Sequence, residues 1–114
     1  MIKPKSFNIN KIDDTHAVVS FSVNKDLFYF NGHFPIQAIL PGVVQLGWTI
    51  EFAKEIFAID LSCNIPMVKF MSPILPEDKV ALNLTLNTEK KNLSFEFYLV
   101  NANKVASTGK VKLL

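Results

Sequence analysis

A histidine, His33, stands in a Gly-His-Phe-Pro turn at residues 32–35, and a Pro41-Gly42 pair follows eight residues after it. An imidazole titrates near neutral pH, so it can accept or deliver a proton during a reaction. The Pro-Gly pair opens an apolar segment typical of a helix, and a helix N-terminus stabilises nearby negative charge. Together these residues predict proton transfer next to a carbonyl group.

The segment 42–57 is the only good helix candidate in the chain, and its first turns are apolar on every side. The apolar residues of these turns are Val43, Val44, Leu46, Trp48 and Ile50. A helix that is hydrophobic all round must be enclosed by other elements. The charges of its second half, Glu51, Lys54 and Glu55, follow at i, i+3 and i+4, which predicts a single polar stripe there.

The rest of the chain alternates between apolar and polar residues with a period of two, as half-buried strands of an antiparallel sheet do. The expected strands cover residues 6–10, 17–23, 65–70, 80–86, 93–99 and 105–113, with turns at 87–92 and 101–104. Since only strands can enclose the helix, one sheet must curl around it. The predicted fold class is α+β: a hot-dog fold, in which a curved antiparallel sheet wraps around one long central helix.

Length and composition indicate one domain over residues 1–114 and exclude several functions. A hydrophobic content of 49% excludes disorder. The net charge is only +2, and all twelve basic residues are Lys, which argues against nucleic-acid binding because Arg is the preferred base-reading and phosphate-binding side chain. The apolar run around residues 36–50 is too short and too interrupted to span a membrane.

The cysteine and histidine content predicts the compartment and the metal status. Cys63 is the only cysteine, so no internal disulfide forms, and no secretory leader is visible. We therefore expect a cytoplasmic protein. The spacing of His16 and His33 matches no metal-binding pattern, so no metal is expected, and His16 should be exposed in a polar turn.

The motifs resemble those of the hot-dog 3-hydroxyacyl-acyl-carrier-protein dehydratases of fatty-acid biosynthesis. The matching residues are Gly32-His33-Phe34-Pro35 and Pro41-Gly42-Val43, and residues 65–78 resemble the family's next strand and turn. The Leu46-Gly47-Trp48 segment is more similar to the aryl-polyene-type branch than to the housekeeping enzymes. The resemblance covers most of the chain.

This sequence departs from the family pattern at two positions. Ala38 replaces a proline of the turn, which is a minor change in stiffness. Gly47 replaces the catalytic Glu or Asp, which is a serious change. One helical turn later, where the family often has glutamine, this chain has Glu51, about 6 Å further along the axis. Glu51 is therefore either a relocated acid that reaches over Gly47 or a solvated helix residue.

The resemblance implies a role for each site residue. His33 is the expected base, Gly42 the anchor of the thioester carbonyl, and Glu51, or His33 acting twice, the expected proton donor. Phe34, Val43, Gly47 and Trp48 are the other expected substrate-site residues, with Phe34 and Trp48 serving as core or tunnel wall. No cofactor is implied, because the acyl group arrives on the phosphopantetheine of acyl carrier protein.

The resemblance also implies a homodimer, or a higher oligomer of dimers, with its tunnels at the interface. A sheet of about seven strands leaves its edge and the apolar helix start poorly covered, which favours the same assembly. Two other functions remain open from the sequence: a hot-dog acyl thioesterase, and a non-catalytic acyl-binding or degenerate dehydratase subunit. Gly47 is the residue that supports the non-catalytic alternative.

Overall fold

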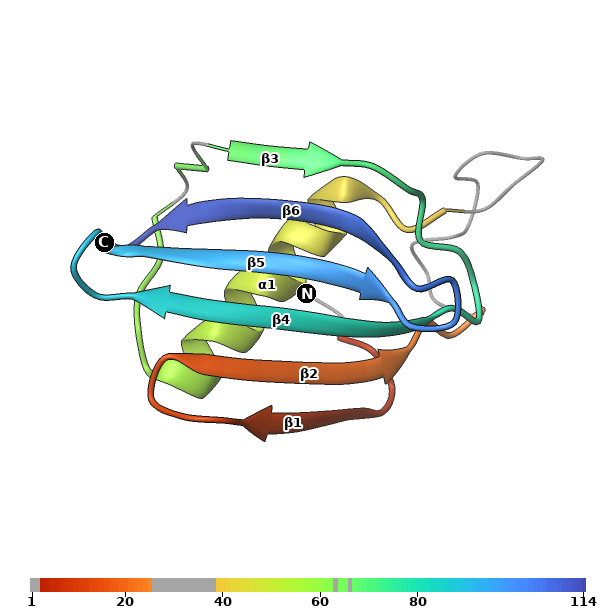
Figure 1. The fold of residues 1–114 in the computed structure, drawn as a ribbon, viewed down its shortest axis with the longest axis horizontal. Helices are drawn as coiled ribbons and strands as arrows, with labels where there is room; N and C mark the ends of the chain where they lie inside the picture. Colours follow the sequence, from red (N-terminus) through yellow and green to blue (C-terminus); the bar gives the residue numbers. More distant parts are fainter. Residues whose placement is uncertain (1–2, 26–38, 63, 66) are drawn as a thin grey trace.

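The computed structural model describes residues 3–25, 39–62, 64–65 and 67–114. Within them, one helix lies across one antiparallel sheet (Figure 1). The predictions for His33, Phe34, Ala38 and Cys63 fall outside the described residues.

The elements follow the sequence pattern to within two residues at each end. The helix α1 is Gly42–Phe57, and the strands are β1 (Phe7–Lys11), β2 (His16–Ser22), β3 (Met67–Phe70), β4 (Lys79–Asn87), β5 (Asn92–Leu99) and β6 (Lys104–Lys112). The expected alternation is confirmed in β4 and β5, where the side chains with even numbers in β4 and odd numbers in β5 are the most buried.

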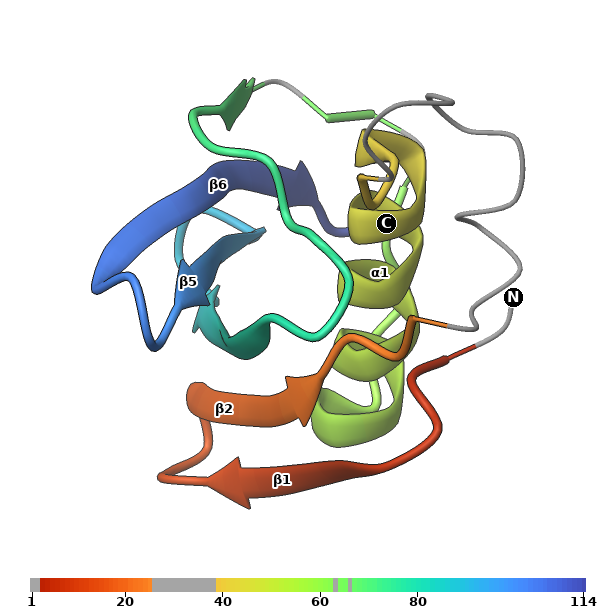
Figure 2. The same ribbon diagram turned by 90° about the vertical axis from the view of Figure 1, so that its right-hand side faces the viewer.

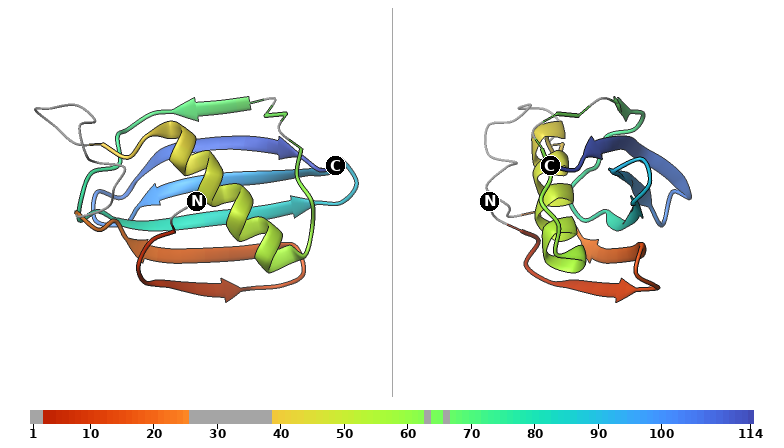
Figure 3. Two further views of the ribbon diagram at one scale, coloured as in Figure 1. Left: turned by 180° about the vertical axis from the view of Figure 1, so that it is seen from behind. Right: turned by 90° about the vertical axis from the view of Figure 1, so that its left-hand side faces the viewer.

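The sheet order is β1-β2-β4-β5-β6-β3, and every neighbouring pair is antiparallel. The described residues thus form six strands, which correspond to the six expected ranges, whereas the sheet was expected to have about seven strands. Figure 2 shows the sheet curving around α1, and Figure 3 shows α1 lying diagonally across its concave face. The predicted α+β arrangement of a curved sheet around one helix is confirmed.

The core lies between the concave face and one side of α1. Trp48 and Phe52 are fully buried there, and Trp48 meets the ring of Phe21 edge-on, with centroids 5.4 Å apart. Under β3 and β6 the packing is close: a Cβ at Gly109 would lie 2.6 Å from both the Phe95 ring and the Met67 carbonyl. Glycine at 109 therefore leaves room for the Phe95 ring of the core to pack against this edge of the sheet.

The expectation that the helix start is enclosed on every side is only half met. Val44 is buried against the sheet, but Val43 is 71% exposed on the opposite side of the same turn. A single sheet can cover only one face of a helix, so the other face needs a different covering. Glu51, Lys54 and Glu55 are exposed, as the polar stripe predicts.

Candidate active site

Helix α1 carries the predicted site residues that the structure describes. Val43, Gly47 and Glu51 are spaced at i, i+4 and i+8, which places them in one row on a helix. This row lies on the side of α1 away from the buried residues, and Val43 and Glu51 are exposed there. Trp48 is fully buried on the opposite side, which is the core position expected as one of its two roles.

The start of α1 is uncapped by side chains. Pro41 occupies the N-cap with an extended backbone and no side-chain cap, and the first turn contains no acidic residue. The N–H groups of Val44 and Gln45 donate to the Pro41 carbonyl. Among the described residues, no hydrogen bond uses the N–H of Gly42 or Val43. These two N–H groups lie at the positive end of the helix dipole and can donate hydrogen bonds to an acceptor atom of a ligand.

A pocket of about 330 Å³ opens at this helix start. It is lined by Leu40, Gly42 and Gln45 from the helix side and by Phe70, Met71 and Ser72 from the end of β3. A larger pocket of about 530 Å³ lies over β1 and β2 and contains none of the predicted residues. We assign the site to the smaller pocket because it contains the uncapped helix terminus.

Gly42 also has a steric reason to be glycine. A Cβ at this position would lie 2.6 Å from the tip of the Phe70 ring. Phe70 is 53% exposed, and its ring lies over the backbone of Gly42. The backbone at Gly42 is therefore open to close approach by either an aromatic ring or a substrate.

A buried polar cluster supports the same helix start. The Ser107 hydroxyl on β6 donates to Gln45 Oε1 over 2.7 Å, and Gln45 Nε2 donates to the Leu40 carbonyl over 3.3 Å. The Thr49 hydroxyl donates to the Gln45 carbonyl over 2.9 Å. Gln45, Thr49 and Ser107 are each at most 3% exposed.

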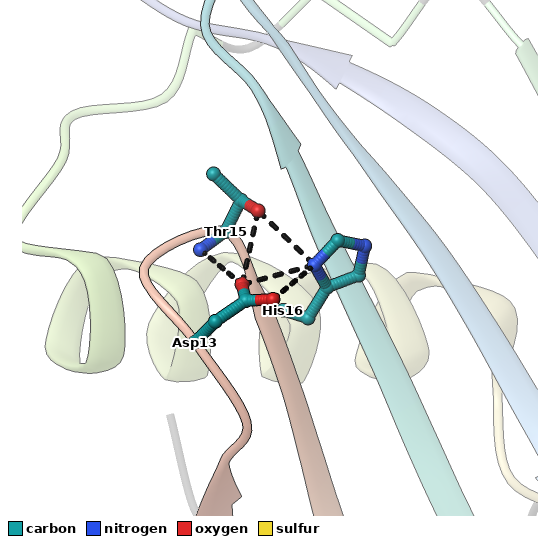
Figure 4. A network of polar contacts seen from close by, with 3 residues as sticks. All are labelled: Asp13, Thr15 and His16. Carbon is teal, nitrogen blue, oxygen red and sulfur yellow. Dashed lines mark hydrogen bonds and ion pairs between the residues drawn. The ribbon is translucent and has the colours of Figure 1, made fainter.

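The histidine that the structure describes, His16, lies in a surface network at the turn between β1 and β2 (Figure 4). Its Nδ1 lies 3.0 Å from Asp13 Oδ1, and the Thr15 N–H donates to the same oxygen over 2.8 Å. The Thr15 backbone hydrogen bond, followed by the His16 contact, lowers the pKa of Asp13 to about 2. The prediction that His16 is exposed is confirmed, with 49% of its side chain accessible.

No group of three or more His, Cys, Asp and Glu side chains suitable for a metal occurs among the residues that the structure describes. No helix in that part of the chain is long and apolar enough to cross a membrane.

Sequence reasoning missed three residues at the helix start: Gln45, Phe70 and Ser107. Gln45 carried a signal, because it is a polar residue within an otherwise apolar turn. Phe70 and Ser107 carried none, because their roles depend on the β3–β6 register, in which they are paired with each other.

The fold and the uncapped helix start define a hot-dog protein, and solved structures agree. The dehydratase heterocomplex ApeI:P from Xenorhabdus doucetiae contains a chain with a TM-score of 0.89 and 32% identity, and 98% of each chain is covered. Thioesterase superfamily member 2 from Mus musculus has a TM-score of 0.74 but only 12% identity, covering 95% of this chain and 81% of that one. That second likeness concerns the fold alone.

The family model described as ApeI-like, ApeI dehydratase, matches residues 9–110. The chain belongs to this dehydratase family. It is also 30% identical over 95 residues to the 3-hydroxyacyl-(acyl-carrier-protein) dehydratase FabZ of Idiomarina loihiensis, a match that covers 74% of this chain. The chain spans about three fifths of the length of such curated relatives, with 62% covered in that protein. The predicted family and its aryl-polyene branch are confirmed.

Proposed function

We propose that this protein removes water from 3-hydroxyacyl thioesters carried on acyl carrier protein and forms trans-2-enoyl thioesters. The observation that carries the proposal is the uncapped start of α1, which opens on the 330 Å³ pocket in a chain of a dehydratase family. The relatives FabZ and ApeI:P are both named as dehydratases, which supports this class of reaction. Acyl carrier protein is the proposed partner, since it carries the substrate.

The chemistry assigns the first step to His33 and Gly42. The His33 imidazole takes the proton from the carbon next to the thioester carbonyl, and the electron pair moves onto the carbonyl oxygen. The Gly42 N–H, at the positive end of α1, stabilises the negative charge that develops on this oxygen. A donor of this kind contributes about 10²–10³ in rate.

The second step breaks the bond between the β-carbon and the hydroxyl oxygen. The electron pair returns from the oxygen to form the double bond, and the hydroxyl leaves as water after it receives a proton. Glu51, or His33 returning the proton that it took, supplies that proton. No metal or further cofactor takes part in these two steps.

The test is an assay of the purified protein with a 3-hydroxyacyl-acyl-carrier-protein substrate, in which both enoyl thioester and free fatty acid are measured. Enoyl thioester supports the proposal, whereas free fatty acid would indicate a thioesterase. Replacing His33 by Ala should lower turnover by about 10²–10⁴, as the loss of a general base does, and we expect the protein to stay folded. His16→Ala is the matched control, since His16 lies in an exposed turn, and it should keep full activity. Equal activity of His33→Ala and wild type would remove His33 as the base.

Gly47 favours a second candidate, a non-catalytic acyl-binding subunit. No acidic side chain among the described residues lines the pocket, and position 47 has no side chain. Absence of both enoyl and free-acid products, together with binding of acyl carrier protein, would identify this function.

We also propose that the protein is a cytoplasmic homodimer. Val43 and the strand β3 present exposed apolar side chains beside the pocket, and a second copy of the chain would cover them. The ApeI:P structure is named as a heterocomplex, so a different subunit is the alternative partner in any test of assembly.

A further inference from the structure

We propose that Gln45 is a positioning residue whose buried amide, anchored by Ser107, fixes the start of α1 so that the Gly42 N–H meets the thioester oxygen. The role rests on the proposed dehydratase function and deepens it, because it names the side chains that hold the anchoring amide in place.

The Gln45 side chain joins the segment before α1 to the strand β6. Its Oε1 accepts a hydrogen bond from Ser107 on β6, and its Nε2 donates one to the carbonyl of Leu40, two residues before Gly42. The Leu40 N–H in turn donates to the Ile74 carbonyl over 2.8 Å. The segment entering α1 is therefore held by the sheet on one side and by the loop after β3 on the other.

The cluster is unnecessary for filling the core. A buried hydrogen bond contributes only about 1 kcal/mol net, and replacing both partners by apolar groups of similar shape is nearly neutral. Yet the three buried polar residues of the described chain, Gln45, Thr49 and Ser107, all belong to this one cluster. An apolar side chain would fill the same volume but would leave the Leu40 carbonyl and the helix start without a fixed orientation.

Orientation matters at this place because charge stabilisation is a short-range effect. A donor must lie about 2.7–3.1 Å from the developing oxyanion, and a displacement of about 1 Å can cost about 10²-fold in rate. Ser107 also pairs with Phe70 in the β3–β6 ladder, and the Phe70 ring packs on Gly42. The Ser107 position on β6 therefore aligns two groups. These are the Gln45 amide, which holds Leu40, and the Phe70 ring, which covers the backbone of Gly42.

The experiment measures dehydration by Gln45→Met, Ser107→Ala and their double variant. We expect kcat to fall by about 10–100-fold with KM changed less than about 2-fold, because the oxygen carries its full charge only in the transition state. The melting temperature should change little in the double variant, in which both polar partners are gone. Ser107→Thr keeps the hydroxyl and should restore most of kcat.

Thr49→Val is the matched control. It removes a buried hydroxyl of the same cluster, one turn further along α1, without touching Leu40 or Ser107. It should keep the wild-type kcat. An equal loss of kcat in Thr49→Val, an unchanged kcat in folded Gln45→Met, or an effect confined to KM would each overturn the role.

A second measurement separates this role from the proposed function. In Gln45→Met, hydrogen exchange should become faster at the Leu40 and Val44 amides, which are hydrogen bonded across this segment, and it should stay unchanged in Thr49→Val. If the wild type forms no enoyl product, the proposed function fails. Unchanged exchange in Gln45→Met would then overturn the positioning role, and faster exchange would uphold its structural part.

Discussion

At the scale of single residues, Gly47 and Glu51 carry the question of the proton donor, although neither lines the assigned pocket and both lie in the row of α1 away from its buried side. Gly47 lies inside α1, where glycine costs about 1 kcal/mol relative to alanine, so some local demand should explain it. Glu51 is exposed one turn later in the same row. A glycine at 47 leaves room either for substrate or for the Glu51 side chain to lean across the row.

Two substitutions separate these possibilities. If Glu51 is the relocated acid, Glu51→Gln should lower turnover sharply, by about 10²-fold or more, and Gly47→Glu should help little because it crowds Glu51. Glu55→Gln is the matched control, since Glu55 is exposed on the same helix and pairs with Lys3 over 2.8 Å. Undiminished activity in Glu51→Gln would remove Glu51 from the mechanism. Activity that rises in Gly47→Glu would indicate a degenerate member.

The lowered pKa of Asp13 predicts that the stability of the protein depends on pH. This dependence comes from a surface turn and not from the active site. The folded-state pKa of Asp13, about 2, lies below the ordinary value of 3.8, so its stabilising effect is complete above about pH 5 and is lost as the pH falls toward 2. The difference in melting temperature between wild type and Asp13→Asn should therefore shrink between about pH 5 and pH 2. Asp14→Asn, next to it, serves as the control. A difference that stays constant over this range would contradict the assigned hydrogen bonds.

At the scale of elements, α1 shows what the sequence can and cannot predict. Its range 42–57 was predicted from Pro41-Gly42 and the apolar turns, because helix starts and apolar faces are local signals. The link from Gln45 to Ser107 joins residues 62 positions apart, so no local signal could reveal it. The exposure of Val43 agrees with the expectation that one sheet leaves the apolar helix start poorly covered, although periodicity alone did not show which residue of that turn faces away from the sheet.

The end of α1 offers a stabilising substitution. Ala58 ends the helix in the left-handed conformation, with φ at 53°, and its N–H donates to the Lys54 carbonyl. Glycine adopts this conformation without strain, so Ala58→Gly should raise the free energy of unfolding by about 0.5–1 kcal/mol. Ala102→Gly, in the exposed turn between β5 and β6, is the control because Ala102 has no positive φ and should gain nothing. Thermal unfolding measures both, and a lower melting temperature for Ala58→Gly would contradict the expectation.

At the scale of the whole molecule, both edge strands of the sheet are largely exposed. The strand β1 pairs with β2 on one side, and its Phe7 ring packs on Phe52 of the helix, with centroids 5.0 Å apart. Within the described part of the chain, the strand β3 pairs only with β6, and all four of its residues are exposed. An exposed apolar edge strand invites pairing with another chain unless charge or coverage prevents it. Of its four residues, only Lys69 carries a charge.

The dimer prediction follows from this edge. If two copies pair through β3, the wild type should have twice the mass of the 12.8 kDa chain at micromolar concentration. A Met67→Lys/Val68→Lys double variant puts one charge on each face of β3 and should yield monomers, because edge lysines block strand pairing. Ile12→Lys/Val100→Lys is the matched control, since both residues are exposed and apolar but lie away from β3. Sedimentation or light scattering measures the mass.

The monomeric variant should also lose dehydration, because the resemblance implies a site shared between His33 of one chain and the helix of the other. A wild-type monomer would contradict the homodimer, and a dimer that persists in the double variant would place the interface elsewhere.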